Sequence, residues 1–188
     1  PDGATLRLAW TPNAGGKNAG DKNGSGSQIG AAQSGIDMVL SLSSDVTGVD
    51  GMSLDLGWAS VAQDSGNANF DDDTDERTIA VKYAMDAWTV GYQWSEEDLG
   101  RSSGAQKYTN DGYGITFQVN DDLSVGFNHY ESEQDNDTDV TTEASSLQIA
   151  YTMGGASFRI ADAEVDNPSY SSTAKDIEAT TISVSLAF

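Results

Sequence analysis

The final stretch of the chain, TISVSLAF (Thr181–Phe188), alternates strictly between an apolar side chain and a small or polar one. Successive side chains of a β-strand point to opposite faces of its sheet, so this stretch predicts a strand with one apolar and one polar face. Helical spacing fits the pattern less well, because a helix brings side chains back to one face only every three to four residues. The apolar row consists of Ile182, Val184, Leu186 and Phe188.

The same alternation recurs in about ten segments, which predicts an all-β protein. Some links between segments are very short, such as Asp86–Ala87 and Gly154–Gly155, and have the composition of tight hairpins. Long links, such as residues 95–111, separate these hairpins. We therefore expect a single domain over residues 1–188 that folds as an antiparallel meander. Its strands are expected at residues 4–11, 35–43, 52–62, 77–85, 87–95, 112–120, 122–131, 144–153, 155–163 and 177–188.

Glycines gather on the face opposite to the apolar rows. Gly57, Gly91, Gly114 and Gly126 each lie between two residues of an apolar row. Glycine inside a strand is normally destabilising and often marks a close approach. Four glycines on one face therefore indicate a face that must stay uncrowded or let something come near.

Composition excludes several classes of protein. The chain has 30 acidic and 9 basic residues, a net charge of -21, which argues against nucleic acid as a partner because phosphate binding needs clustered Lys and Arg. It has no cysteine, which excludes disulfides, thiolate metal sites and cysteine nucleophiles. No apolar run is long enough for a transmembrane helix.

The apolar face admits two explanations, a transmembrane barrel or a soluble β-sandwich. Strands of about 9–11 residues with an apolar outside, a polar inside and loops of unequal length are typical of transmembrane barrels. Lipid offers no hydrogen bonds, so strands that cross it must close into a barrel. Aromatic residues on the apolar rows, among them Trp10, Trp58, Trp88 and Trp94, favour the barrel because such barrels carry aromatic girdles.

The C-terminal strand 182–188 and the repeated hairpins resemble those of the Gram-negative trimeric porins, in particular the acidic alphaproteobacterial type. The resemblance implies the C-terminal portion of a barrel of about 16 strands. It implies a water-filled channel for small hydrophilic solutes, a homotrimer in the bacterial outer membrane, contact with lipid and lipopolysaccharide, and no enzymatic activity. It also implies that the terminal strand is the signal for outer-membrane assembly, carried by Ile182, Val184, Leu186 and Phe188. A complete ten-stranded barrel is the alternative.

Charged residues on the polar face are candidates for lining a pore. Opposite charges facing each other across a constriction create a transverse field that sorts solutes by charge. The alternative is that these charges are simply solvated, because barrel interiors are polar. The candidates are the cations Arg7, Lys82 and Arg159 and the acids Asp37 and Asp55.

Two Asp-x-Asp-x-Asp runs lie in expected surface loops. Spaced carboxylates suit Ca²⁺, although neither run has the glycine or the final glutamate of an EF-hand loop. Either the loops bind calcium, which could also bridge them to lipopolysaccharide phosphates, or they are solvated acidic loops. No other cofactor is expected. The runs are Asp71, Asp73, Asp75 and Asp135, Asp137, Asp139.

Rival functions remain at this stage. His129 is the only histidine, so a catalytic triad or a multi-histidine metal site has little to build on. A surface-binding barrel or adhesin would use the acidic loops as its active part. A soluble β-sandwich binding module would bury the apolar face that a barrel exposes to lipid.

Overall fold

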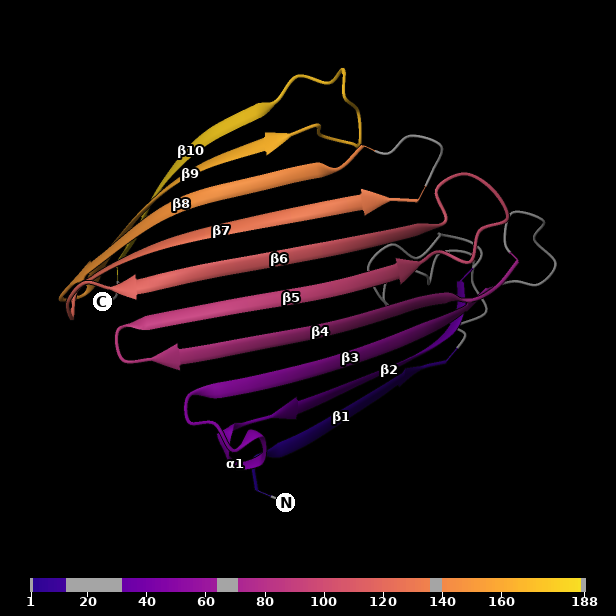
Figure 1. Ribbon diagram of the computed structural model, residues 1–188, viewed down its shortest axis with the longest axis horizontal. Helices are drawn as coiled ribbons and strands as arrows, with labels where there is room; N and C mark the ends of the chain where they lie inside the picture. The colour runs from indigo at the N-terminus through magenta and orange to yellow at the C-terminus, as the bar shows by residue number, and fades with distance from the viewer. Residues whose placement is uncertain (1, 13–31, 64–70, 136–139, 187–188) are drawn as a thin grey trace.

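The computed structural model describes residues 2–12, 32–63, 71–135 and 140–186. They form one antiparallel sheet of ten strands in chain order, β1 to β10, and each strand pairs with its neighbours in sequence (Figure 1). The predicted all-β meander is therefore confirmed. The strands are β1 (Ala4–Thr11), β2 (Ala32–Leu42), β3 (Met52–Gln63), β4 (Thr74–Met85), β5 (Trp88–Asp98), β6 (Lys107–Gln118), β7 (Leu123–Gln134), β8 (Thr142–Met153), β9 (Ala156–Asp166) and β10 (Ile177–Leu186).

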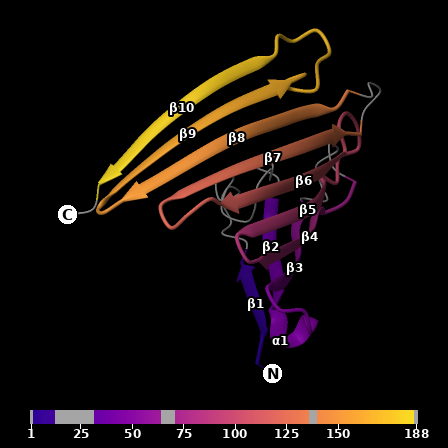
Figure 2. The same ribbon diagram turned by 60° about the vertical axis from the view of Figure 1, so that its left-hand side comes forward.

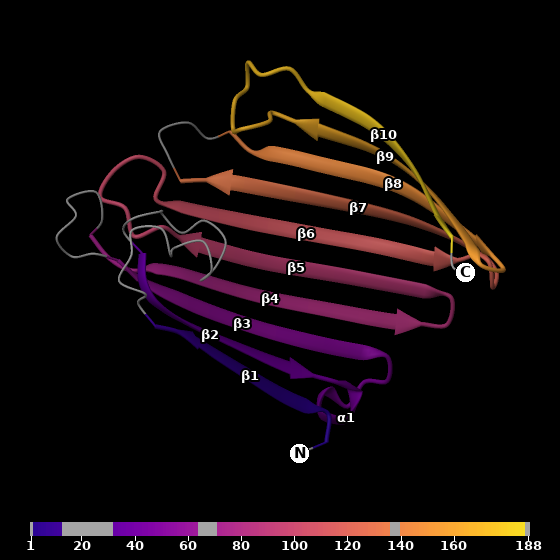
Figure 3. The same cartoon turned by 180° about the vertical axis from the view of Figure 1, so that it is seen from behind.

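The short hairpin links lie together at one end of the sheet, and the long connections 99–106 and 167–176 lie at the other (Figure 3). Asp86 and Gly154 have φ angles of 50° and 59°. These left-handed values are the ones that tight two-residue hairpins require. Between β6 and β7, the side-chain oxygen of Asn120 accepts hydrogen bonds of 2.9 Å from the backbone N–H groups of Asp122 and Leu123. The turns at these positions thus follow from local residue chemistry.

The link from β2 to β3 contains a short helix, α1 (Ser44–Thr47). Ser43 caps its N-terminus, and Gly48 ends it with a φ of 73°. This pairing of a serine N-cap with a left-handed glycine is a common way to satisfy the end groups of a helix. Among the described residues, no helix has the length and apolar character needed to cross a membrane.

The strands extend further than predicted at the end with the long connections. β5 ends at Asp98 instead of residue 95, β6 begins at Lys107 instead of residue 112, and β7 ends at Gln134 instead of residue 131. Hydropathy loses its period of two there, because polar residues occupy both faces. Backbone pairing nevertheless continues without a break in register as far as Asp98 opposite Lys107. At the other end, hydropathy predicted the strand ends to within two residues.

The described part of the chain has no hydrophobic core of the kind found in soluble domains. Only two hydrophobic residues in it, Val61 and Leu99, are buried, and no large side chain is fully enclosed. The apolar rows are instead exposed along strand after strand, up to 71 % for Ile182. A β-sandwich would cover this face with a second sheet. The described residues form no second sheet, and the sheet curves into an open trough with β1 and β10 at its edges (Figure 2).

Candidate functional site

Three of the four predicted glycines, those of β5, β6 and β7, lie close together on the concave face of the sheet. Gly91 of β5 is directly opposite Gly114 of β6, and Gly126 of β7 is directly opposite Thr116 of β6. Together with Gly112 they line a hollow of about 660 Å³. The concave face is therefore hollowed where side chains are missing.

The neighbours of these glycines leave room for a larger residue. A β-carbon added at Gly91 would lie 3.8 Å from the nearest atom, the carbonyl oxygen of Val81, and one at Gly114 would lie 3.4 Å from the carbonyl oxygen of Phe127. Both distances are ordinary van der Waals contacts. Crowding therefore does not explain why Gly91 and Gly114 are glycines. The remaining explanation is that this face has to stay open. Gly57 differs, because a β-carbon there would meet the methyl group of Thr78 at 2.5 Å.

A network of hydrogen bonds runs across the same face towards the end with the long connections. Asn110 of β6 is its centre. Its side-chain oxygen accepts hydrogen bonds of 2.6 Å from the hydroxyls of Tyr130 and Ser132, and its side-chain nitrogen donates to Ser95 at 3.3 Å. The network joins β5, β6 and β7 and positions these polar groups on the wall. We did not predict it from sequence, because the expected strand at 112–120 left Asn110 in a loop.

Two carboxylates face each other on the concave face. Glu76 of β4 is directly opposite Glu97 of β5, and both line a second hollow of about 350 Å³ together with Asp37. Like charges in directly opposed positions destabilise a sheet. One carboxylate oxygen of Glu97 is buried and has no hydrogen-bond partner in the described part of the chain. The sequence prediction missed this pair because it ended the two strands at residues 77 and 95.

Solved structures give the fold a known counterpart. The chain is similar to the anion-selective porin from Comamonas acidovorans, with a TM-score of 0.69 and 15% identity over 97% of this chain and 59% of that one. It is also similar to a porin refined at 1.8 Å resolution, with a TM-score of 0.67 and 15% identity over 100% of this chain and 59% of that one. A mutant of the Rh. blastica porin gives a TM-score of 0.62 and 17% identity over 100% of this chain and 64% of that one.

This chain has the porin fold. The predicted resemblance to porins is thereby confirmed at the level of fold. The chain spans about three fifths of the length of the porins it matches. No protein-family model matches the sequence, and no curated protein matches it.

The strand register places the predicted charged residues on the concave face. Lys82 is directly opposite Gly91 and lines the larger hollow, whereas Asp37 lines the smaller one. Arg7, Asp55 and Arg159 share this face through their cross-strand partners but line neither hollow. Since these five residues are distributed along the strands, they do not form one compact cluster. Their role in selectivity stays a prediction.

The expected assembly strand is β10, at one edge of the described sheet. Ile182, Val184 and Leu186 of β10 are 71 %, 56 % and 56 % exposed. They occupy the apolar face, opposite Ile160, Phe158 and Ala156 of β9. Phe188 lies outside the described residues, so the signal as a whole stays a prediction.

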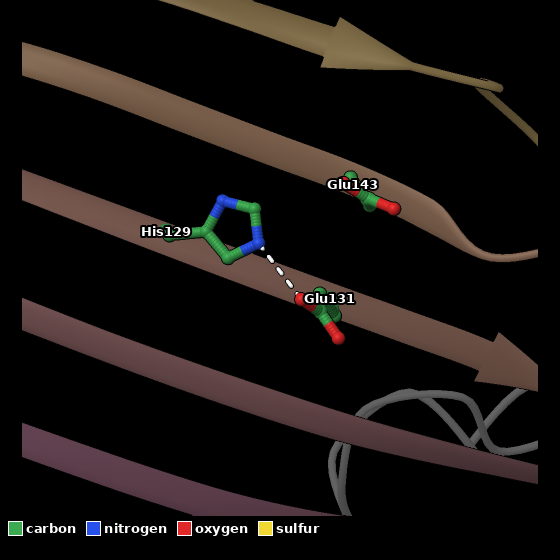
Figure 4. Close-up of side chains that lie close together, drawn as sticks. All are labelled: His129, Glu131 and Glu143. Atoms are coloured by element: carbon green, nitrogen blue, oxygen red, sulfur yellow. Dashed lines mark hydrogen bonds and ion pairs between the residues drawn. The ribbon is translucent and has the colours of Figure 1, made fainter.

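The described residues bring together one group of three side chains that could hold a metal ion, and it is not one of the aspartate runs. The group consists of His129 and Glu131 of β7 and Glu143 of β8, whose potential ligand atoms lie within 4.8 Å of one another (Figure 4). His129 Nε2 is 3.0 Å from a carboxylate oxygen of Glu131. His129 pairs with Tyr113 of the apolar row, so the group faces outward.

The aspartate runs are only partly described. Asp73 accepts a hydrogen bond of 3.0 Å from the backbone N–H of Gln63, and Asp75 is directly opposite Asp98. Asp71 donates its backbone N–H to the carbonyl oxygen of Gly100. Asp135 donates its N–H to the carbonyl oxygen of Lys107, whereas Asp137 and Asp139 lie outside the described residues. Calcium binding at these runs stays a prediction.

Proposed function

We propose that this chain forms part of the wall of a water-filled channel in a bacterial outer membrane, through which small hydrophilic solutes and ions diffuse passively. The observation that carries the proposal is the contrast between the two faces of the sheet. One face exposes row after row of apolar side chains, whereas the other is polar, lined by glycines and hollowed. Lipid outside and water inside satisfy both faces at once.

The open edges of the sheet support a larger barrel. β1 and β10 each pair on one side only among the described residues, which leaves a row of unpaired backbone groups at each edge. Such groups are too costly to expose to lipid, so a membrane-spanning sheet must be closed by further strands or closed upon itself. The porins of similar fold are longer than this chain, which favours closure by further strands.

We further propose a homotrimer that contacts lipid and lipopolysaccharide. Support comes from the resemblance of the C-terminal strand and from the broad apolar face, which offers a surface for both lipid and another copy. An aromatic pair on this face at the hairpin end, Trp88 and Phe117 with ring centroids 4.4 Å apart, fits an interfacial girdle. Chemical cross-linking in native membranes tests the trimer.

We infer that the protein is not an enzyme. Its sole histidine, His129, is opposite Tyr113 of the apolar row, and its side chain contacts Glu131 and the ring of Tyr113. Apart from Lys82, a solute in the larger hollow would meet glycines and amide or hydroxyl side chains such as Gln93, Asn128 and Thr116. These groups form hydrogen bonds but are weak acids and bases, which suits transport better than proton transfer.

Reconstitution of the full-length protein tests the proposed function. In planar bilayers we expect stepwise increases in current, and in liposomes we expect swelling with small sugars. Protein that is folded and inserted in the bilayer but gives neither current nor swelling would contradict the channel and favour a binding role. Purification without detergent as a soluble domain would contradict the membrane location itself.

A further inference from the structure

The connection between β9 and β10, residues 167–176, folds against the concave side of the sheet. Thr142 of β8, which is directly opposite Ser132 and shares its face, anchors it. The hydroxyl of Thr142 donates to the carbonyl oxygen of Asn167 at 2.8 Å and accepts from the backbone N–H of Tyr170 at 3.1 Å. The side-chain nitrogen of Asn167 adds a bond of 3.1 Å to the carbonyl oxygen of Thr141. The start of the connection is therefore fastened to β8.

The side chain of Tyr170 reaches beyond β8 and contacts β7 and β6. Its hydroxyl lies 2.6 Å from the hydroxyl of Ser132 on β7, which is only 5% exposed. Its ring lies with its centroid 5.6 Å from that of Tyr108 on β6. Tyr108 and Ser132 share the face of Gly112 and Gly126, since residues two apart in a strand point the same way. The ring of Tyr170 thus lies over the concave wall.

The backbone around Tyr170 is held in an unfavourable conformation. Asn167, Ser169 and Tyr170 have φ angles of 48°, 61° and 57°. Side chains other than glycine rarely adopt these left-handed values, and a bulky aromatic residue does so least readily. Such strain persists only where the surroundings enforce it, and it concentrates at sites that serve a function. At Tyr170 the surroundings are Thr142, Ser132 and the ring of Tyr108, which contact its backbone, hydroxyl and ring.

Tyr170 also extends the polar network of the wall. Ser132, its partner, donates a hydrogen bond of 2.6 Å to Asn110, and Asn110 in turn binds Ser95 and Tyr130. A continuous chain of hydrogen bonds therefore joins the β9–β10 connection to β5. Connected polar networks of this kind hold their members in fixed positions.

We propose that Tyr170 determines the size selectivity of the channel by holding the β9–β10 connection over the mouth at the end with the long connections. The inference rests on the proposed channel function. With Tyr170 in place, the connection covers part of the concave face of β6, β7 and β8. A solute entering the channel would otherwise contact that part. Without the Tyr170 side chain, the contacts with β6 and β7 are lost while the described bonds to Thr141 and Thr142 remain, so the connection can swing away from β6 and β7.

The test measures liposome swelling by sugars of increasing size, from a pentose to a trisaccharide, with full-length protein. Tyr170→Ala should raise the swelling rate for the largest sugars several-fold relative to the pentose, because the mouth widens. Tyr170→Phe keeps the ring beside Tyr108 but loses the hydroxyl, so it should shift the same ratio in the same direction by less. Ser132→Ala removes the partner hydroxyl and should resemble Tyr170→Phe.

Ser171→Ala is the matched control in the same connection. Ser171 Oγ has a hydrogen bond of 3.2 Å to Thr173 within the connection, so its loss should leave the size profile as in the wild type. An unchanged profile in all of Tyr170→Ala, Tyr170→Phe and Ser132→Ala, with the barrel folded, overturns the role of Tyr170. If Tyr170→Ala does not fold, the other two variants decide the question. Wild-type protein that inserts without any swelling would overturn the proposed channel itself, which is a distinguishable result.

Discussion

The convex and concave faces of the sheet are built from alternate residues of the same strands, yet they carry opposite kinds of surface. Along β8, Ile149 and Leu147 stand exposed on the convex face, at 43 % and 58 %, while Gln148 between them points to the concave face and hydrogen-bonds Asn128. Both faces share one set of backbone hydrogen bonds. The two faces therefore differ only in the side chains that they expose.

The two faces should therefore contribute to different properties of the protein, folding in the membrane and passage of solutes. In lipid, an apolar convex residue is in its preferred solvent, so a charge there costs free energy of folding in the membrane. A residue on the concave face is in contact with water. A substitution there should change which solutes pass through the channel and leave folding of the barrel largely unaffected. Substitutions on neighbouring positions of one strand should therefore affect different measurements.

The largest effect is expected from a charge on the convex face. Ile149→Arg should destabilise the folded barrel by about 2–4 kcal/mol if it lies near the middle of the bilayer. Gln148→Arg, one residue away on the concave face, should cost much less. Denaturant titration of refolding in lipid vesicles measures both. Equal losses in the two variants would contradict the assignment of the faces.

A second effect should follow from filling the glycine-lined hollow. Gly91→Leu and Gly114→Leu place side chains into the space of about 660 Å³, so single-channel conductance should fall clearly. Stability should change little, since the added β-carbons meet their neighbours at 3.4 Å or more. Val90→Leu on the convex face is the control and should conduct like the wild type. A normal conductance in both glycine variants would show that the hollow lies off the path.

A smaller effect is expected from reversing the cations of the concave face. Lys82→Glu and Arg159→Glu should increase the preference for cations, because the local field in the pore becomes more negative. Reversal potentials measured in a salt gradient report this change. Lys107→Glu, on the convex parity beside Glu96, is the control away from the concave face. Unchanged reversal potentials would remove Lys82 and Arg159 from selectivity.

The smallest effect concerns calcium. If the aspartate runs bind Ca²⁺, saturating calcium should raise the thermal stability, because a ligand that binds only the folded state stabilises it by mass action. The double variant Asp71→Asn with Asp73→Asn should lose part of that gain. A melting temperature that does not respond to calcium in the wild type would end the hypothesis.

Local chemistry explains why so much of the sheet could be predicted from the sequence. Alternation assigns each residue to a face, and the hairpin residues Asp86 and Gly154 specify tight turns without help from distant parts. The prediction failed where this signal stops. Asn110, Glu76 and Glu97 lie in strand ends where both faces are polar, and there only continued pairing with the neighbouring strand shows that the strand persists.

The fold class, the two faces and the end with the tight turns follow from local sequence patterns, because they depend on residues close together in the chain. Contacts between distant residues become visible only in the folded chain: Gly91 with Gly114, Glu76 with Glu97, and Tyr170 with Ser132. The last pair is 38 residues apart in sequence. No local pattern encodes such a contact, since it depends on the register of the strands between and on the path of a connection.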